Sequence, residues 1–162
     1  MQLDWQRLFL SADGRIGRQE YWVGFLLILG ASVVLKFIPF LGPLLSLALI
    51  YPQVCVGSKR LHDMGRSGFL MLIPYGVVVV GFILAGVFGG MAALSGAFSH
   101  SGGAAAAAGL AGLGAAVGLI GLACLISLGF IVWVGVTPSQ PGENRYGPEP
   151  MPAPAPVPPP AA

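Results

Sequence analysis

Residues 69–136 contain no Asp, Glu, Lys or Arg in a chain of 162 residues. A bilayer explains this gap, because a charge at the centre of a spanning helix costs about 2.5–3.5 kcal/mol. The whole composition agrees, since 9% of the residues are charged, against roughly 25% in ordinary globular proteins, and the mean hydropathy is +0.83. These values exclude a soluble enzyme, a nucleic-acid-binding protein and a disulfide-stapled secreted domain. They indicate an integral membrane protein.

A membrane-spanning helix needs about 20 mostly apolar residues. Four segments are candidates, at about 21–38, 44–57, 69–89 and 109–136. The second is short, and Pro52 and Gln53 weaken it. The sequence therefore predicts an all-α fold in which residues 1–150 form an integral membrane four-helix bundle made of two helical hairpins. Residues 151–162, MPAPAPVPPPAA, consist almost entirely of Pro and Ala and cannot bury a core, so we expect a disordered tail.

Small residues and prolines predict how these spans are joined and bent. Residues 90–108 are small and of low complexity, and we expect a loop there, although its alanine run forms helix as readily. Pro52 and Pro74 are each expected to kink a helix, because each ring frees a backbone carbonyl one turn earlier, at Ala48 and Leu70.

Glycines recur at helical spacing in the last two spans. Gly86 and Gly90 form a GxxxG pair, as do Gly114 and Gly118. Such pairs let helix backbones approach closely in a membrane, where lipid supplies no hydrophobic drive for association. The alternative interpretation is that these spans are simply rich in glycine.

The charged residues predict the orientation of the chain. Lys and Arg gather in short cytoplasmic loops of membrane proteins. Seven of the eight basic residues fall in three segments that four spans place on one side, and the 90–108 loop has none: Arg7, Arg15, Arg18, Lys59, Arg60, Arg66 and Arg145. We therefore expect both termini to be cytoplasmic. The first 20 residues mix apolar and charged side chains and are expected to lie in the membrane interface.

Three polar blocks carry a family resemblance. GRIGRQEYW stands at 14–22, KRLHDMGRSGF at 59–69 and GENRYGPEP at 142–150. In order and spacing they resemble the bacterial inner-membrane family of domain of unknown function 805, over roughly residues 10–150. The resemblance implies a small multi-spanning protein of the bacterial plasma (inner) membrane, and it implies no reaction.

His62 and Asp63 are the first candidates for chemistry. A histidine beside a carboxylate is typical of general bases and metal sites. Adjacent residues on a helix point about 100° apart and do not orient one another, so we expect no catalytic residue here. Cys55 and Cys124 fall within apolar spans, and no motif indicates a metal or another cofactor.

Two other interpretations of the polar blocks stay open. In the first, Asp63 and Glu20 lock the three segments together by pairing with Arg15, Arg18, Arg60 or Arg66. In the second, the arginines bind lipid phosphate bidentately, which arginine does better than lysine. The candidate site is a cytoplasmic polar cluster with these members: Arg15, Arg18, Glu20, Arg60, His62, Asp63, Arg66, Asn144 and Arg145.

These observations predict a non-enzymatic membrane component that is structural, lipid-interacting or partner-binding. Membrane lipids are the expected partners, together with a second copy of the chain or another membrane protein, and nucleic acid is not. The alternative is a small transporter or channel subunit that acts as an oligomer, because four spans enclose no path alone. Gln53 and a few serines are the polar groups available at mid-membrane depth.

Overall fold

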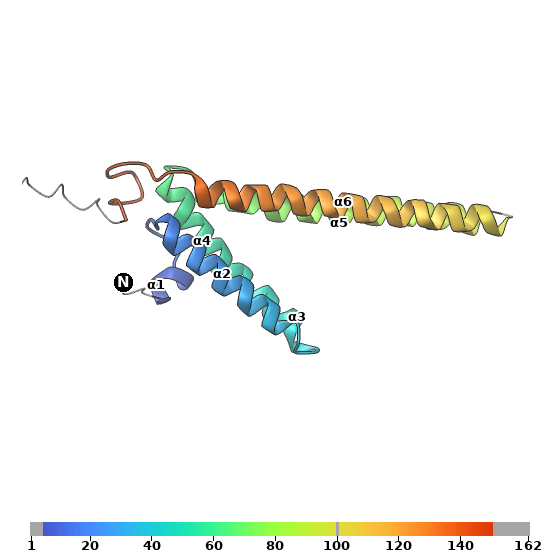
Figure 1. Cartoon of the computed structure of the whole chain (residues 1–162), viewed down its shortest axis with the longest axis horizontal. Helices are drawn as coiled ribbons and strands as arrows, with labels where there is room; N and C mark the ends of the chain where they lie inside the picture. The colour runs from blue at the N-terminus through green and yellow to red at the C-terminus, as the bar shows by residue number, and fades with distance from the viewer. Residues whose placement is uncertain (1–4, 100, 151–162) are drawn as a thin grey trace, which may run out of the picture. The chain divides into compact units, whose positions relative to one another are not determined.

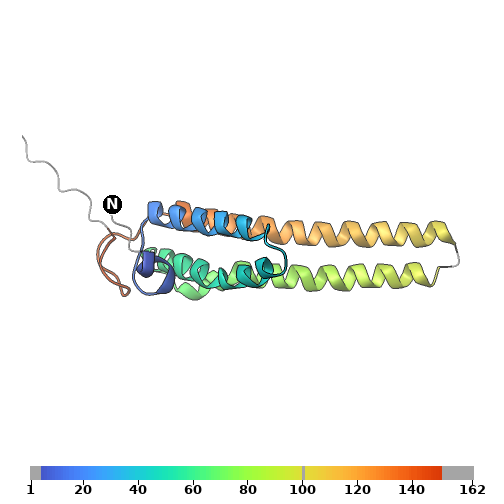
Figure 2. The ribbon, with the colours of Figure 1, turned by 90° about the horizontal axis from the view of Figure 1, so that it is seen from below.

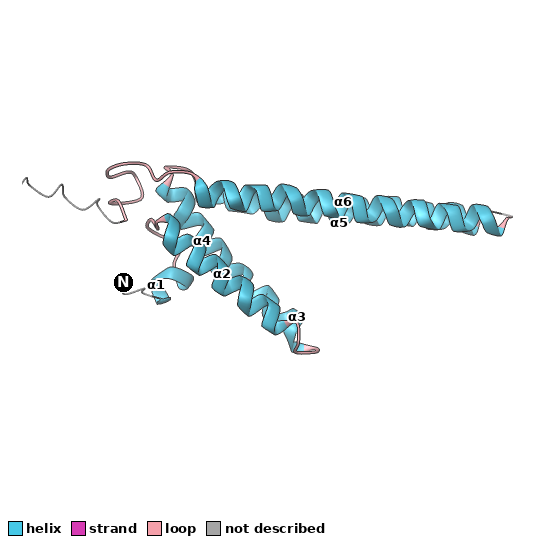
Figure 3. Cartoon of the chain, viewed as in Figure 1, coloured by secondary structure: helices cyan, strands magenta, loops and turns pink. Residues whose placement is uncertain are grey.

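The computed structural model describes residues 5–99 and 101–150. These residues form helices and loops without a strand, as Figure 3 shows, so the expected all-α class is confirmed. The disordered tail predicted for 151–162 lies outside the described residues. The elements are α1 (Trp5–Leu10), α2 (Arg18–Leu35), α3 (Leu41–Ala48), α4 (Ile50–Asp63), the 3-10 helix η1 (Gly68–Met71), α5 (Leu72–Ala97) and α6 (Gly102–Val136).

Four helical segments in the described part of the chain are long and apolar enough to cross a membrane, as predicted. They are Arg18–Leu35, Leu41–Asp63, Gly68–Ala97 and Gly102–Val136. The interruptions fall where the two prolines predict them. One lies at Leu49, between α3 and α4, and the other at the junction of η1 and α5.

The second span differs most from its expected range of 44–57, because it continues to Asp63. Lys59 and Arg60 were expected in a polar loop, and the structure corrects this by placing them on the last turns of α4. The physical reason is that their charges are buried and satisfied within the protein. The helix ends at Asp63, and two residues later Gly65 has a φ of +70°, the left-handed conformation that glycine adopts without strain.

The chain divides into two compact units. The described part of unit 1 comprises residues 5–71 and 134–150, and unit 2 comprises Leu72–Trp133. In unit 1, α2 and the α3–α4 pair form a helical hairpin, which Figure 1 shows with α1 beside it. Gly24 permits this packing, because a Cβ there would stand 3.3 Å from both methyl groups of Val56.

Unit 2 is a second hairpin, in which α5 and α6 run side by side along their length (Figures 1 and 2). Small residues form the seam between them. A Cβ on Gly81 would lie 2.8 Å from the Ala123 Cβ, and one on Gly112 would meet Ala92. The two predicted GxxxG pairs do not form this seam, since a Cβ on any of their four glycines would meet no atom within 4 Å.

The expected loop at 90–108 is mostly helix, which corrects that prediction. Helix α5 continues to Ala97 and α6 begins at Gly102. Alanine has the highest helix propensity of all residues, and a Cβ on Gly96 would lie 3.2 Å from the Ala105 carbonyl oxygen. Low complexity here therefore reflects close helix packing rather than a loop.

Candidate functional site

Asp63, on the last turn of α4, is the centre of a buried polar cluster in unit 1. Its Oδ1 accepts a hydrogen bond from Arg15 Nε at 3.1 Å, and its Oδ2 accepts one from Arg60 Nη1. All three side chains are buried. The Asp63 carbonyl oxygen also accepts the Gln140 N–H at 2.8 Å. One carboxylate thus joins an arginine of the loop before α2 to an arginine of its own helix.

Arg15 uses its remaining donors to hold the segment that follows α6. Its Nη1 donates to the carbonyl oxygens of Gly142 at 2.6 Å and Gly147 at 3.2 Å, and its Nη2 donates to that of Gln140 at 2.5 Å. The planar guanidinium presents five donors in a fixed geometry, which suits several carbonyls at once. Arg15 therefore fixes the path of residues 140–147.

Arg60 does the same for the end of α6 and the residues just beyond it. Its donors reach the carbonyl oxygens of Val134 at 3.2 Å, Ile16 at 3.4 Å and Thr137, and the Ser139 hydroxyl at 3.2 Å. The last four carbonyls of a helix lack partners within the helix and carry the negative end of its dipole. A buried cation there donates hydrogen bonds to these carbonyls and balances the negative end of the dipole. We call Arg15, Arg60 and Asp63, with residues 134–147, the polar clasp.

Lys59 is a buried cation that sequence reasoning treated only as a mark of orientation. It is 1% exposed, and its Nζ donates to the carbonyl oxygens of Arg7 and, at 3.1 Å, Leu8. These belong to the last turn of α1, so Lys59 caps α1 as Arg60 caps α6. Its position four residues after the buried Cys55 is the signal that places it on the inner face of α4.

His62 lies at the edge of the clasp and is partly exposed. Its Nδ1 is 3.3 Å from the Gly14 carbonyl oxygen, and its ring stacks on Tyr146 with centroids 3.8 Å apart. Asn144 donates to the His62 carbonyl oxygen at 3.0 Å, and the Arg145 guanidinium lies 4.7 Å from the centre of the Tyr146 ring. These contacts bind residues 144–146 to the end of α4.

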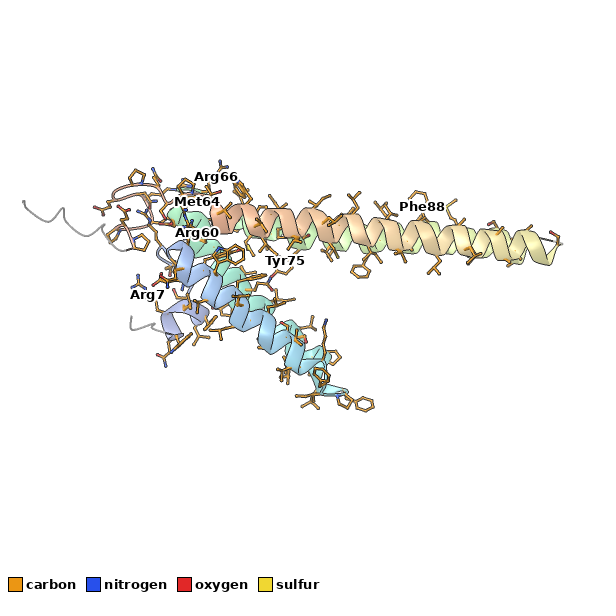
Figure 4. The ribbon with its side chains drawn as sticks, viewed as in Figure 1. Arg7, Arg60, Met64, Arg66, Tyr75 and Phe88 are labelled. Carbon is orange, nitrogen blue, oxygen red and sulfur yellow. The ribbon has the colours of Figure 1, made fainter. Side chains whose placement is uncertain are left out.

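The other predicted members of the cluster lie outside the buried core. Glu20 caps α2 by accepting the Gly17 N–H at 3.2 Å. Arg18, Arg66 and Arg145 are exposed. In Figure 4, Arg60 lies among the ribbons at the end of α4, whereas Arg66 extends outward from that region. Among the described residues, no group of three or more His, Cys, Asp or Glu side chains is placed to hold a metal ion.

The structure therefore joins Arg15, Arg60, Asp63, His62 and Asn144 into one network. Sequence reasoning missed the backbone partners, which come from residues 134–147, and the ring of Tyr146. Within the described part of the chain, three buried cations (Arg15, Lys59 and Arg60) outnumber the single buried carboxylate. Backbone carbonyl oxygens accept hydrogen bonds from the excess cations. A sequence motif does not reveal which carbonyls these are.

Arg15→Lys is expected to release residues 140–147 while keeping the charge. Lysine lacks the planar fork, so two or more charge-assisted hydrogen bonds are lost, each worth about 1.5–3 kcal/mol. Hydrogen–deuterium exchange in this segment is then expected to be at least roughly tenfold faster than in the wild type, since about 1.4 kcal/mol is a factor of ten. Arg18→Lys, at an exposed position of the same polar block, is the control and leaves the exchange unchanged. Equal exchange in the wild type and both variants contradicts the assignment.

Comparison with known proteins identifies the family. The family model described as "Protein of unknown function (DUF805)" matches residues 9–148, which is most of the chain. The chain belongs to this family. The resemblance of the three polar blocks is thereby confirmed, and they include the clasp residues Arg15, Arg60 and Asp63.

Two relatives from Escherichia coli (strain K12) share part of this DUF805 sequence. "Inner membrane protein YhaI" is 34% identical over 88 residues, which cover 49% of this chain and 74% of YhaI. "Uncharacterized protein YiiR" is 34% identical over 80 residues, which cover 43% of this chain and 55% of YiiR, so the chain spans about half the length of that relative. No solved structure matches the chain.

Proposed function

We propose that this protein is a non-enzymatic component of the bacterial inner membrane that interacts with lipid through exposed arginines. The relative YhaI is named as an inner membrane protein, which supports the location. Both termini are cytoplasmic in this proposal, because seven of the eight basic residues fall in segments, or near ends of spans, that four spans place on one side.

The observation that carries the proposal is the division of the arginines into two sets. Arg15 and Arg60 are buried, and their donors are directed to internal oxygen atoms. They hold the protein together and do not face a lipid. Arg18, Arg66 and Arg145 are exposed, and a guanidinium binds a phosphate group bidentately. The clasp is the structural element, and the exposed arginines around it are the lipid-interacting element.

The surroundings of His62 support a non-enzymatic role. One ring nitrogen faces the Gly14 carbonyl oxygen, and one ring face is covered by Tyr146. A catalytic histidine needs a ring nitrogen within reach of the group it protonates and a partner that orients it for that step. Here the contacts of the ring join two segments of the chain, which is a packing role.

Native mass spectrometry tests the lipid proposal with phosphatidylglycerol as the probe. The wild type is expected to retain phosphatidylglycerol, and the Arg18→Gln/Arg66→Gln/Arg145→Gln variant is expected to bind it roughly a hundredfold more weakly, at about 1 kcal/mol per arginine. The melting temperature of that variant should stay near the wild-type value, because the buried Arg15, Arg60 and Asp63 are unchanged. Lys36→Gln, which removes a charge from an exposed residue at the other end of α2, is the matched control. Equal retention by the wild type and the triple variant would refute the proposal.

A further inference from the structure

Helix α1 is attached to α4 through its backbone carbonyls. Lys59 Nζ donates to those of Arg7 and Leu8, and the Tyr51 hydroxyl donates to that of Leu10 at 2.9 Å. These are carbonyls of the last turn of α1, which have no partners within a helix. Two side chains of a membrane-spanning helix therefore hold the carbonyl end of α1.

This attachment places α1 beside the span rather than beyond its end. Tyr51 precedes Lys59 by eight residues on α4, which is about 12 Å along the helix axis. Side chains of a helix lean toward its N-terminus, so Lys59 reaches back along the span and away from the clasp. Leu8 is buried, and a Cβ on Gly24 of α2 would lie 3.6 Å from its Cδ2. Figure 1 shows α1 alongside α2 and α4.

The exposed part of α1 carries apolar side chains together with Gln6. Trp5 is 50% exposed and Leu10 is 64% exposed, and Trp5 stacks on Phe9 with ring centroids 6.1 Å apart. This face continues onto Tyr51, which contacts Leu10 and is itself 58% exposed on the spanning helix. Lipid covers the exposed surface of a spanning helix, so the lipid around Tyr51 also reaches the exposed face of α1.

We propose that α1 is an interfacial anchor that lies at the boundary between the headgroups and the acyl chains of the bilayer. Trp5 and Leu10 enter the lipid, and buried Lys59 is the pin that holds the helix at this depth. Tryptophan is enriched at this boundary because its ring is apolar with one polar edge. The exposed Arg7 beside this face fits an anionic headgroup by charge. Binding to a second copy of the chain or to another protein would not require a tryptophan at this boundary together with an exposed arginine.

Quenching of tryptophan fluorescence by brominated lipids tests the depth of Trp5. The signal of Trp5 is the difference between the wild type and Trp5→Phe, both reconstituted in vesicles of phosphatidylcholine and phosphatidylglycerol. We expect this signal to be quenched at least twofold more strongly by bromines near the headgroups than by bromines at the bilayer centre. Quenching by aqueous iodide alone would overturn the proposal, and so would a Trp5 signal that responds to protein concentration and to no bromine.

The pin is tested with Lys59→Met, which keeps the apolar stem and removes the donor. We expect Trp5 to lose its headgroup-depth quenching and to gain quenching by iodide. If Lys59→Met does not fold, Tyr51→Phe replaces it as the test. This variant loses a single hydrogen bond at an exposed position, and it is expected to shift the quenching in the same direction by a smaller amount. Unchanged quenching in the folded variants would exclude the pin.

Helix α1 carries none of Arg18, Arg66 and Arg145, so its anchoring is independent of the lipid binding proposed for these arginines. The triple variant that loses phosphatidylglycerol is expected to keep wild-type quenching of Trp5. The two failures are therefore distinguishable. Equal retention of phosphatidylglycerol would refute the arginine proposal alone, and an aqueous Trp5 would refute the anchor alone.

Discussion

Asp63→Asn is expected to lower the free energy of unfolding by about 3–5 kcal/mol, the cost of breaking a buried ion pair by removing one partner. Asparagine keeps the shape of the side chain but not its charge. Arg15 and Arg60 then remain buried, with carbonyl and hydroxyl oxygens as their partners and no counter-ion. The side chain is 0% exposed, so solvent does not replace the lost charge. Unfolding by titration with sodium dodecyl sulfate from a mild detergent measures this change.

Glu143→Gln is the matched control for this prediction. It removes a carboxylate from the same segment that the clasp holds, but Glu143 is exposed. Exposed charges contribute about 0–1 kcal/mol, so its unfolding is expected to resemble that of the wild type. If Asp63→Asn unfolds at the same detergent composition as Glu143→Gln, the clasp does not stabilise the fold.

Gly112→Leu is expected to force α5 and α6 apart and to destabilise unit 2 by about 1–3 kcal/mol or more, as overpacking of a close contact does. A Cβ on Gly112 would meet the Ala92 Cβ, and it would also lie 3.5 Å from Gly89 Cα and carbonyl oxygen. These neighbours are backbone atoms or a Cβ fixed to the backbone, so they cannot move aside by a change of rotamer. The same detergent titration reports the effect.

Gly114→Leu separates this explanation from a general cost of losing glycine. Gly114 lies on the same helix two residues away, and a Cβ there would meet no atom within 4 Å. We expect Gly114→Leu to unfold at the same detergent composition as the wild type. Two equally destabilised variants would show that the seam through Gly81 and Gly112 is not what holds the hairpin together.

The membrane class and the four spans could be predicted because they depend on local composition. A stretch without charges, such as 69–136, needs no knowledge of its neighbours to be recognised. The breaks near Pro52 and Pro74 were predictable for the same reason, since proline acts on the carbonyl of the preceding turn of its own helix.

The end of the second span could not be predicted, because it depends on partners distant in sequence. Lys59, Arg60 and Asp63 have the composition of a loop. They belong to a helix because the carbonyls of residues 134–147 and of the last turn of α1 receive their donors. The seam of unit 2 was missed for a related reason. GxxxG spacing identifies glycines that share a face, but it does not identify which face meets the other helix.

The candidate site was predicted in its residues and only partly in its contacts. Asp63 pairs with two of the four arginines that the sequence offered, Arg15 and Arg60. Charge alone does not distinguish these from Arg18 and Arg66, because all four occupy the same polar blocks. Burial distinguishes them, and burial follows from the packing of α2 and α4.

A double-mutant cycle between Arg15 and Asp63 tests whether the polar cluster is an internal clasp. The variants are Arg15→Gln, Asp63→Asn and the two combined, and the quantity is the free energy of unfolding in detergent. Removing both charges leaves less unpaired charge buried than removing Asp63 alone. We therefore expect the double variant to be less destabilised than the sum of the single variants, by about 0.5–3 kcal/mol. Additive effects, within about 0.5 kcal/mol, would contradict it.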